Sequence, residues 1–164
     1  MRQATRERTI RWEDPLASAA SIANLSGLEA MRAVLERVVP PPPIAVLLDF
    51  ALVEADEGRA VFEGTPGEMH YNPIGLVHGG FALTLFDSAM GCAIHTMLLA
   101  GVGYATTDVQ VRLIRGITRD TGRIRCEGRA VHVGRSTATG EATLRDMQGR
   151  LLGTGTTGCA ILRR

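Results

Sequence analysis

The chain has 164 residues, a length that suits one domain with a substantial hydrophobic core. Its 18 basic residues, all arginine, nearly balance 17 acidic residues and leave a formal net charge of +1, which disfavours a charge-driven nucleic-acid partner. Aromatic residues make up only 4% of the chain, which disfavours a stacking surface for single-stranded nucleic acid. We therefore expect no nucleic-acid partner.

The N-terminal residues 1–15 are charged, and no apolar run of the kind found in secretory signals follows them. The three cysteines, Cys92, Cys126 and Cys159, lie far apart, and no two of them form a Cys-x-x-Cys pair. This pattern favours reduced thiols over a disulfide framework or a zinc site. We expect a cytoplasmic protein without a resident metal.

A helical extension is predicted at the N-terminus, over residues 1–43. Ser26 and Glu29 have the spacing of a capping box, which marks the start of a helix. Apolar residues then recur at helical spacing, at Leu28, Met31, Val34, Leu35 and Val38. Four prolines at 40–43 end the pattern, so we expect one amphipathic helix before a main domain at 44–164.

The main domain begins with two predicted strands inside residues 44–64, separated by the sequence Asp-Glu-Gly at 56–58. From Tyr104 onward, four segments have the alternating or β-branched character of strands: residues 104–117, 122–133, 136–146 and 150–162. Short polar connections separate them, and their lengths suit hairpins.

A central helix is predicted from His78 or Gly79 to about Ala100. Apolar residues occupy almost every side of it, so a sheet has to surround it. Asp87 and His95 are costly in hydrocarbon, which favours a buried helix of a water-soluble core over a membrane span. Together these elements predict an α+β fold in which an antiparallel sheet wraps a long helix.

The first turn of this helix has the features of an oxyanion site. Gly79 and Gly80 allow close approach of a ligand, and free N–H groups at a helix start favour negative charge. Asp87 lies eight residues beyond Gly79, a rise of roughly 12 Å along the axis. One carbonyl group cannot contact both residues of a single helix. If both act on one substrate, they come from two subunits, so we expect a dimer.

Each of these residues also has a structural interpretation. A buried aspartate can pair with an arginine, and a histidine such as His78 is often a hydrogen-bonded structural residue. Asn72 before Pro73 is a common turn former. Thr106 and Thr107 at the start of a strand are typical strand residues. The histidines lack the spacing of metal ligands, so no metal site is predicted.

The motifs together resemble one known family. Asn72, the segment Gly-x-Val-His-Gly-Gly at 75–80, Leu-Phe-Asp ending at Asp87 and the strand at 104–115 resemble the hotdog-fold acyl-CoA thioesterases of the phenylacetic acid degradation (PaaI-like) family. The resemblance covers roughly residues 40–164. The N-terminal helix is similar to an extension found in some bacterial members.

The resemblance implies a fold, an assembly and a set of roles. It implies a hotdog fold whose protomers join their sheets edge to edge as homodimers, which commonly pair into tetramers. Asp87 would be the nucleophile or general base, and Gly79 would donate its N–H to the thioester oxygen from the partner subunit. Asn72 would place the water or the carboxylate, and His78 would support the loop and the carbonyl. A threonine at the start of the following strand would assist; Thr106 matches best, and Thr107 is the near alternative.

Coenzyme A is expected as part of the substrate, and no separate cofactor is implied. Arg115, Gly134 and Arg135 are candidates for contacts with its phosphates, because arginine binds phosphate well. Many family members have Arg-Pro at the end of the strand, whereas this chain has Arg115 followed by Gly116. The walls of the acyl pocket would come from the helix, the partner subunit and the N-terminal extension, and Phe81, Leu85 and Met90 are candidates for lining it.

The predicted function is hydrolysis of an aryl- or medium-chain acyl-CoA thioester to the free acid and coenzyme A. Two alternatives remain open from the sequence. One is a hotdog enoyl-CoA hydratase or dehydratase, although the His-Gly-Gly run is not typical of those enzymes. The other is a non-catalytic acyl-CoA-binding protein. Release of free thiol separates the first function from both alternatives.

Overall fold

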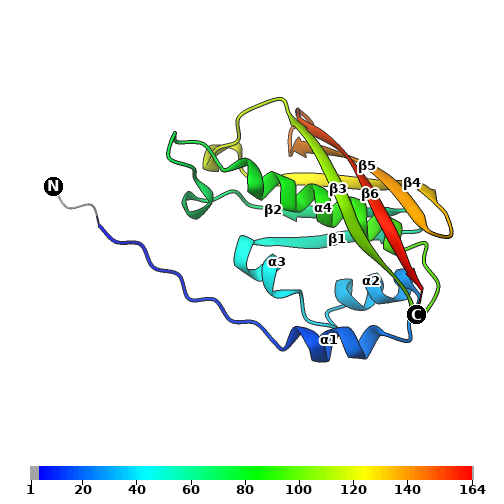
Figure 1. Ribbon diagram of the computed structural model, residues 1–164. Helices are drawn as coiled ribbons and strands as arrows, with labels where there is room; N and C mark the ends of the chain where they lie inside the picture. The colour runs from blue at the N-terminus through cyan, green and yellow to red at the C-terminus, as the bar shows by residue number, and fades with distance from the viewer. Residues whose placement is uncertain (1–3, 164) are drawn as a thin grey trace.

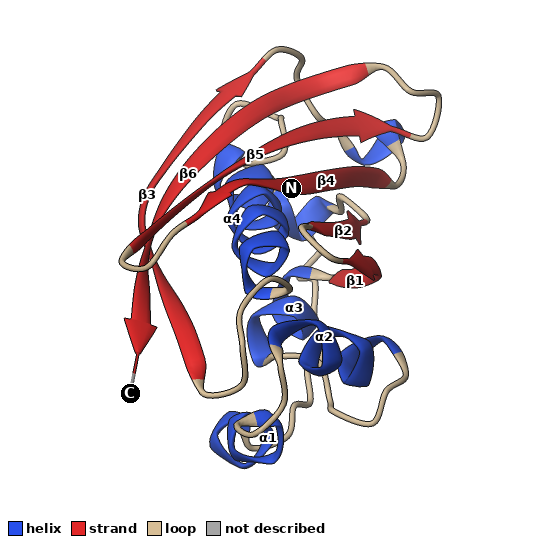
Figure 2. Ribbon diagram, turned by 90° about the vertical axis from the view of Figure 1, so that its right-hand side faces the viewer, coloured by secondary structure: helices blue, strands red, loops and turns tan. Residues whose placement is uncertain are grey.

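Six antiparallel strands form one curved sheet, and a long helix lies on its inner side (Figures 1 and 2). The computed structural model describes residues 4–163. The strands are β1 (Phe50–Asp56), β2 (Arg59–Gly64), β3 (Val102–Leu113), β4 (Ile124–Val133), β5 (Thr137–Asp146) and β6 (Leu151–Arg163). The helices are α1 (Pro15–Ile22), α2 (Gly27–Leu35), α3 (Pro43–Leu48) and α4 (Gly79–His95), with short 3-10 turns η1 (Glu68–His70) and η2 (Arg119–Thr121). The predicted fold class is confirmed.

The central helix α4 is held against the sheet by its apolar side. Leu85, Phe86 and Met90 are fully buried there. The helix and sheet approach most closely at Gly128 of β4, where an added Cβ would collide with the backbone of Ala89. Glycine is therefore needed at that point of β4 to let the helix settle onto the sheet.

The helix ends at His95 instead of reaching Ala100 as predicted. Thr96 closes it with N–H bonds to the carbonyls of Cys92 and Ile94, and the following turn contains Gly101 at a φ of +76°. Apolar residues continue past His95, but they do so in the loop that leads to β3. Hydrophobicity alone therefore overestimated the length of the helix.

The four strands predicted after residue 104 are confirmed, but one of the predicted hairpins is wrong. The strand order is β1-β2-β4-β5-β6-β3, so β3 pairs with β6 and β4 pairs with β2. The connection at 114–123, which contains η2, therefore crosses between strands that are not neighbours. A local turn signal reports that the chain changes direction, whereas long-range packing decides which strand it joins. As a result β3 is an edge strand.

The N-terminal region holds more helix than predicted. The capped helix is confirmed as α2, and Ser26 and Glu29 form both bonds of the capping box. The short helix α1 was missed, because none of its residues is buried and it carries no apolar stripe. Residues 43–48 form α3, whereas a strand was predicted from residue 44. Pro43 opens α3 at a position where its fixed φ favours a helix, and Asp49, at a φ of +57°, ends it.

Figure 2 shows α1, α2 and α3 gathered near the β1 edge of the sheet. The start of α2 lies against the end of α4, where an added Cβ at Gly27 would collide with the carbonyl of His95. The N–H of Gly27 donates to the carbonyl of Leu98, in the turn after α4, at 3.0 Å. Among the residues that the structure describes, no helix has the length and hydropathy needed to cross a membrane. Cys92, Cys126 and Cys159 are free thiols.

Candidate active site

The start of α4 presents one occupied and one open backbone N–H group. His78 is the N-cap residue, and its Nδ1 accepts a 2.9 Å hydrogen bond from the N–H of Gly80. The N–H of Gly79, one residue earlier, has no acceptor among residues 4–163. Of the two glycines, Gly79 is therefore the one whose N–H can bind a ligand oxygen at the positive end of the helix.

The same bond assigns the protonation of His78. A neutral imidazole that accepts at Nδ1 carries its hydrogen on Nε2. His78 is exposed, and its ring lies against Gly80, so this second donor is open to a ligand near the start of α4. The backbone of His78 is fixed as well, because its N–H donates to the carbonyl of His70 at 2.7 Å. These two hydrogen bonds fix the side chain and the backbone of His78 in the loop that it was predicted to support.

Asp87 lies in the middle of α4, partly exposed, on the side that faces β3. The hydroxyl of Thr106 donates to its Oδ1 at 2.9 Å. The hydroxyl of Thr107 instead contacts Asp108, its sequence neighbour, at 3.3 Å. A bond to a carboxylate is among the stronger hydrogen bonds in proteins, so Thr106 fixes the orientation of Asp87.

A bulge in β3 explains why the two threonines differ. The pairing of β3 with β6 shifts between Thr106 and Asp108. Before the bulge, Tyr104 and Thr106 face the helix; after it, Val109 and Val111 pack against the core. The extra residue changes which side chains point inward. Thr107 sits within the bulge and is turned away from Asp87.

Tyr104 is a neighbour of this site that the sequence reasoning missed. Its ring lies over Gly91, where an added Cβ would come within 2.6 Å of the hydroxyl oxygen. Burial raises the pKa of Tyr104, so its hydroxyl stays protonated at neutral pH. Burial likewise raises the pKa of the adjacent Cys92 thiol to about 12, although a hydrogen bond with Tyr104 acts in the opposite direction. In the sequence, the signal of this close approach was Gly91, which lies one helical turn after Asp87 in an otherwise apolar helix.

Asn72 shapes the loop in front of α4. Its Oδ1 accepts from the N–H groups of Ile74 and Leu76, at 3.0 and 3.2 Å. Its own N–H donates to the carbonyl of Leu76 at 2.8 Å. Within the described residues of one protomer, Asn72 has no hydrogen bond to Asp87. The side-chain NH₂ is the part of Asn72 left for a ligand or another subunit.

Gly79 and Asp87 are not brought together within one protomer. They belong to the same straight helix, eight residues apart, which separates their backbones by roughly 12 Å. Gly79 contacts the end of β3, where Leu113 would lie 3.3 Å from an added Cβ, whereas Asp87 contacts the middle of that strand through Thr106. Within one chain, the N–H of Gly79 and the carboxylate of Asp87 are therefore too far apart to contact the same carbonyl group.

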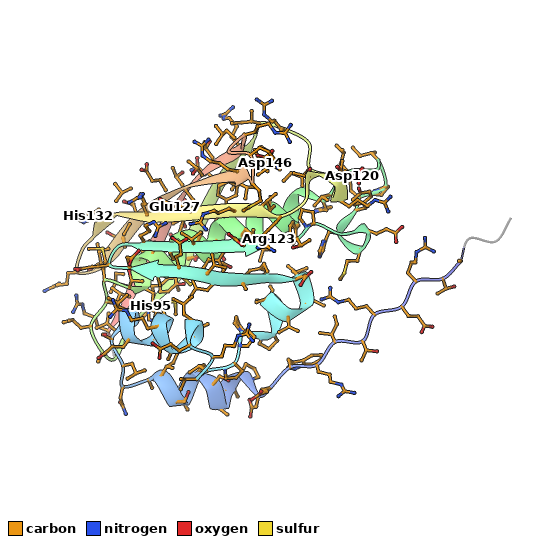
Figure 3. All side chains as sticks on the ribbon, turned by 180° about the vertical axis from the view of Figure 1, so that it is seen from behind. His95, Asp120, Arg123, Glu127, His132 and Asp146 are labelled. Atoms are coloured by element: carbon orange, nitrogen blue, oxygen red, sulfur yellow. The ribbon has the colours of Figure 1, made fainter. Side chains whose placement is uncertain are left out.

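The residues predicted to bind phosphate are also separated. Arg115 follows the end of β3, and its Nε donates to the carbonyl of Leu151. Gly134 and Arg135 form the β4–β5 turn, which lies level with Tyr104 at the start of β3. Figure 3 shows His132, just before this turn, and Asp120 in η2 at opposite ends of the molecule. Along the strand the two arginines are roughly 30 Å apart.

The predicted acyl-pocket residues are largely part of the core. Leu85 and Met90 are fully buried, on the side of α4 that faces the sheet. Phe81 is 4% exposed and stacks on His70 with a ring-centroid distance of 4.4 Å. It borders a small cavity beside His78, but Leu85 and Met90 do not line a cavity among the described residues. Their apolar character made Leu85 and Met90 candidates for the acyl pocket, but their packing against the sheet explains that character.

Groups that could hold a metal ion require at least three suitable side chains. The His, Cys, Asp and Glu side chains of residues 4–163 form no such group.

The fold and the His-Gly-Gly start of α4 can now be compared with known proteins. The model of the thioesterase superfamily matches residues 74–152, which include α4, Asp87 and β3. The chain is therefore similar to the thioesterase superfamily over this segment, and it has the hotdog fold. The predicted resemblance to its PaaI-like members is confirmed. A search of curated proteins finds no significant match.

Solved structures show the same fold over most of this chain. The PaaI protein of E. coli, from the phenylacetic acid degradation operon, has 18% identity and a TM-score of 0.72, with 85% of this chain and 96% of that chain covered. A phenylacetic acid degradation-related protein of Ralstonia eutropha has 22% identity and a TM-score of 0.71, with coverages of 79% and 98%. The TT0310 protein of Thermus thermophilus has 26% identity and a TM-score of 0.67, with coverages of 76% and 99%.

Proposed function

We propose that the protein is an acyl-CoA thioesterase that hydrolyses aryl- or medium-chain acyl-CoA, with Asp87 as its nucleophile or general base. The observation that carries this proposal is the carboxylate of Asp87, held by Thr106 on the exposed edge of the sheet. A carboxylate on an apolar helix, oriented by a hydroxyl, suits attack on a thioester or on water. The superfamily supports thioester hydrolysis as the reaction class.

The proposal includes a homodimer joined through β3, and dimers that pair into tetramers. An edge strand of 12 residues offers its backbone groups to another strand. Antiparallel pairing of two β3 strands would set the two α4 helices side by side in opposite directions. Gly79 of one protomer then meets Asp87 of the partner subunit, so that both can contact one carbonyl group. The same pairing puts Arg115 and the partner's Arg135 at one end of the assembled sheet, within reach of one coenzyme A.

The chemistry follows from these positions. The thioester oxygen accepts from the N–H of Gly79 and, beside it, from Nε2 of His78. Asp87 of the partner subunit either attacks the carbonyl carbon or removes a proton from a water that attacks it. If Asp87 attacks, the carbon–sulfur bond breaks, the thiolate of coenzyme A leaves, and one water hydrolyses the acyl–aspartyl anhydride to the acid and restores Asp87. If water attacks, loss of the thiolate gives the acid directly. In both routes the same single water supplies the proton that the thiolate takes up. The oxyanion formed on the way is stabilised by the N–H donor and the helix start.

A thiol-release screen over aryl and straight-chain acyl-CoA thioesters tests the reaction. Thiol release that depends on Asp87 supports it. Hydration of an enoyl-CoA without thiol release would indicate a hydratase, and binding without turnover would indicate an acyl-CoA-binding protein.

Subunit complementation tests the shared site. Gly79→Pro and Asp87→Asn chains, each inactive alone, are co-expressed with different tags and purified as mixed dimers. In a two-fold dimer one of the two sites would hold intact Gly79 and Asp87 together, so mixed dimers should regain about half of the wild-type turnover. Sites contained within single protomers would give no recovery.

A further inference from the structure

A cavity of about 830 Å³ lies between the N-terminal extension and the β1 edge, away from the Asp87–Thr106 pair. Its inner wall includes buried Met31 of α2, Phe62 of β2 and the half-buried Cys92 of α4. Its outer rim includes the exposed residues Glu13 and Arg37. The cavity therefore has an apolar interior and a rim with charged side chains.

The size and lining of this cavity are those of a small-molecule site. Ligand pockets typically measure about 300–1,000 Å³, with mostly apolar walls and a few polar groups. Protein interiors are otherwise close-packed, and an apolar space gives water few partners. Aliphatic side chains and prolines dominate the wall, and Phe62 is the one aromatic residue among its described lining residues. Such a wall fits a flexible alkyl chain better than a stacked ring.

The chain itself creates this space. The prolines at 40–42 form one wall, and Pro42 has the extended backbone angles of φ −63° and ψ 146°. The helix α2 packs against β1 where Ala30 and Met31 meet Ala55, and the cavity lies beside this contact, where the stiff proline connection crosses from α2 to α3. Cys92, five residues beyond Asp87 on α4, closes the inner end.

Arg37 at the rim is held in a strained conformation. Its φ is +59°, in the left-handed region that arginine rarely adopts. The N–H of Arg37 donates to Val34 and that of Val38 donates to Ala33, the two bonds of a Schellman helix end, where glycine is the usual residue. Its guanidinium has no ion pair or hydrogen bond among residues 4–163. An arginine kept at a glycine position, at the mouth of an apolar cavity, points to an anionic group there.

We infer that this cavity binds a straight-chain aliphatic carboxylate, with the alkyl chain inside and the carboxylate at Arg37. The site is distinct from the proposed catalytic site and does not depend on thioester hydrolysis. It takes the chemical class of acid that a medium-chain thioesterase would release. Glu13, on the same rim, opposes the carboxylate and moderates its affinity.

Isothermal titration of the intact protein with hexanoate, octanoate, decanoate and decanol tests the inference. Each added methylene that enters the cavity should strengthen binding by about fourfold, until the chain fills the space. Arg37→Gln should weaken decanoate binding by about fivefold, the scale of an exposed ion pair, and leave decanol unchanged. Glu13→Gln should strengthen decanoate binding.

Two further variants separate binding from folding. Arg37→Gly removes the charge and also relieves the left-handed strain, so it should weaken decanoate binding while its melting temperature stays the same or rises. Val34→Phe, which places a larger side chain on the cavity wall, should reduce the longest chain accepted. Arg32→Gln, on the same helix but outside the cavity lining, is the matched control and should bind decanoate as the wild type does.

Three results would overturn the inference. The first is the absence of saturable decanoate binding at millimolar concentration. The second is binding that Val34→Phe leaves unchanged, which would place the acid elsewhere. The third is equal loss of decanoate affinity in the Arg32 and Arg37 variants, which would indicate a general charge effect.

Discussion

The hydroxyl of Thr106 donates a 2.9 Å hydrogen bond to Oδ1 of Asp87, across the gap between β3 and α4. The adjacent Thr107 makes no hydrogen bond to this acid among the described residues and bonds to Asp108 instead. One bulge in β3 produces this difference between two chemically identical neighbours. Substituting Thr106 and Thr107 in turn therefore compares two identical side chains that differ only in their position.

Thr106→Val should lower kcat by about tenfold or more, because a hydrogen bond to a charged group contributes roughly 1.5–3 kcal/mol. Thr107→Val should keep near-wild-type kcat. Thiol release from a medium-chain acyl-CoA measures both. Valine keeps the shape and the strand preference of threonine, so equal effects in the two variants would contradict a specific role for Thr106.

Asp87→Asn should abolish most hydrolysis, with a loss of about 10² to 10⁴-fold in kcat, because it removes the attacking or proton-accepting group. Shape and size are preserved, so folding and oligomeric state should survive, as size-exclusion chromatography and circular dichroism can check. Near-wild-type turnover in a correctly assembled variant would make Asp87 a structural carboxylate.

Gly79→Pro should lower kcat by about 10² to 10³-fold by removing the open N–H donor. The fold should tolerate it, because proline is favoured at the first position of a helix and His78 has a ψ of 134°, which suits a residue before proline. Gly79→Ala is the control, since it adds the same Cβ near Leu113 but keeps the N–H. Equal losses in both variants would point to crowding at Leu113.

Acid should destabilise the protein through buried His70 and half-buried His95. Burial lowers the pKa of His70 from its ordinary value of 6.5, and the charge of Arg8 lowers it further; burial also lowers the pKa of His95. As the pH falls, the unfolded chain takes up these protons first. The contribution to stability is therefore complete above about pH 6.5 and is lost as the pH falls through 6.5 toward the folded pKa.

Urea unfolding at pH 7.5 and pH 5.5 measures this dependence. His70→Gln should reduce the difference in the free energy of unfolding between the two pH values. His132→Gln, at an exposed position, is the control and should leave the difference as in the wild type. A pH dependence that His70→Gln does not change would assign acid sensitivity to other groups.

Gly128→Ala should lower the free energy of unfolding by about 2–3 kcal/mol, because its Cβ would collide with the backbone of α4 at Ala89 and force helix and sheet apart. Gly116→Ala should change it by less than about 0.5 kcal/mol, since its nearest neighbour is the Leu76 side chain at 3.4 Å. Chemical denaturation of both variants provides the measurement. Similar stabilities would mean that the helix moves aside at little cost.

Local patterns in the sequence were enough to predict much of the architecture. Apolar residues on nearly all sides of the segment at 79–95 require burial, and the alternating segments after Tyr104 require strands, because these periodicities follow from the geometry of the chain itself. The capping box of α2 could be predicted for the same reason, since Ser26 and Glu29 bond to backbone groups within one helical turn. The acid at Asp87 and the glycines before it stood out against this regular background.

Only part of the candidate site could be predicted from the sequence. The sequence identified Asp87, Gly79 and His78 as a group, and it predicted that one helix separates Gly79 from Asp87, because helical rise per residue is fixed. It favoured Thr106 only as the better match to the family and left Thr107 open. That choice depends on a bulge created by pairing with Cys159 and Gly158, about 50 residues away along the chain.

Contacts between distant segments decided the remaining features. Pairing of β3 with β6 instead of β4 leaves β3 at the edge, and no local signal at 114–123 encodes it. Residues 43–48 are apolar enough for a strand, but a proline start and their place beside β1 make them α3. The cavity at Arg37 likewise exists only because α2, the prolines and β1 meet there. The periodicity of a segment determines its own conformation, whereas its neighbours are determined by the free energy of packing the whole chain.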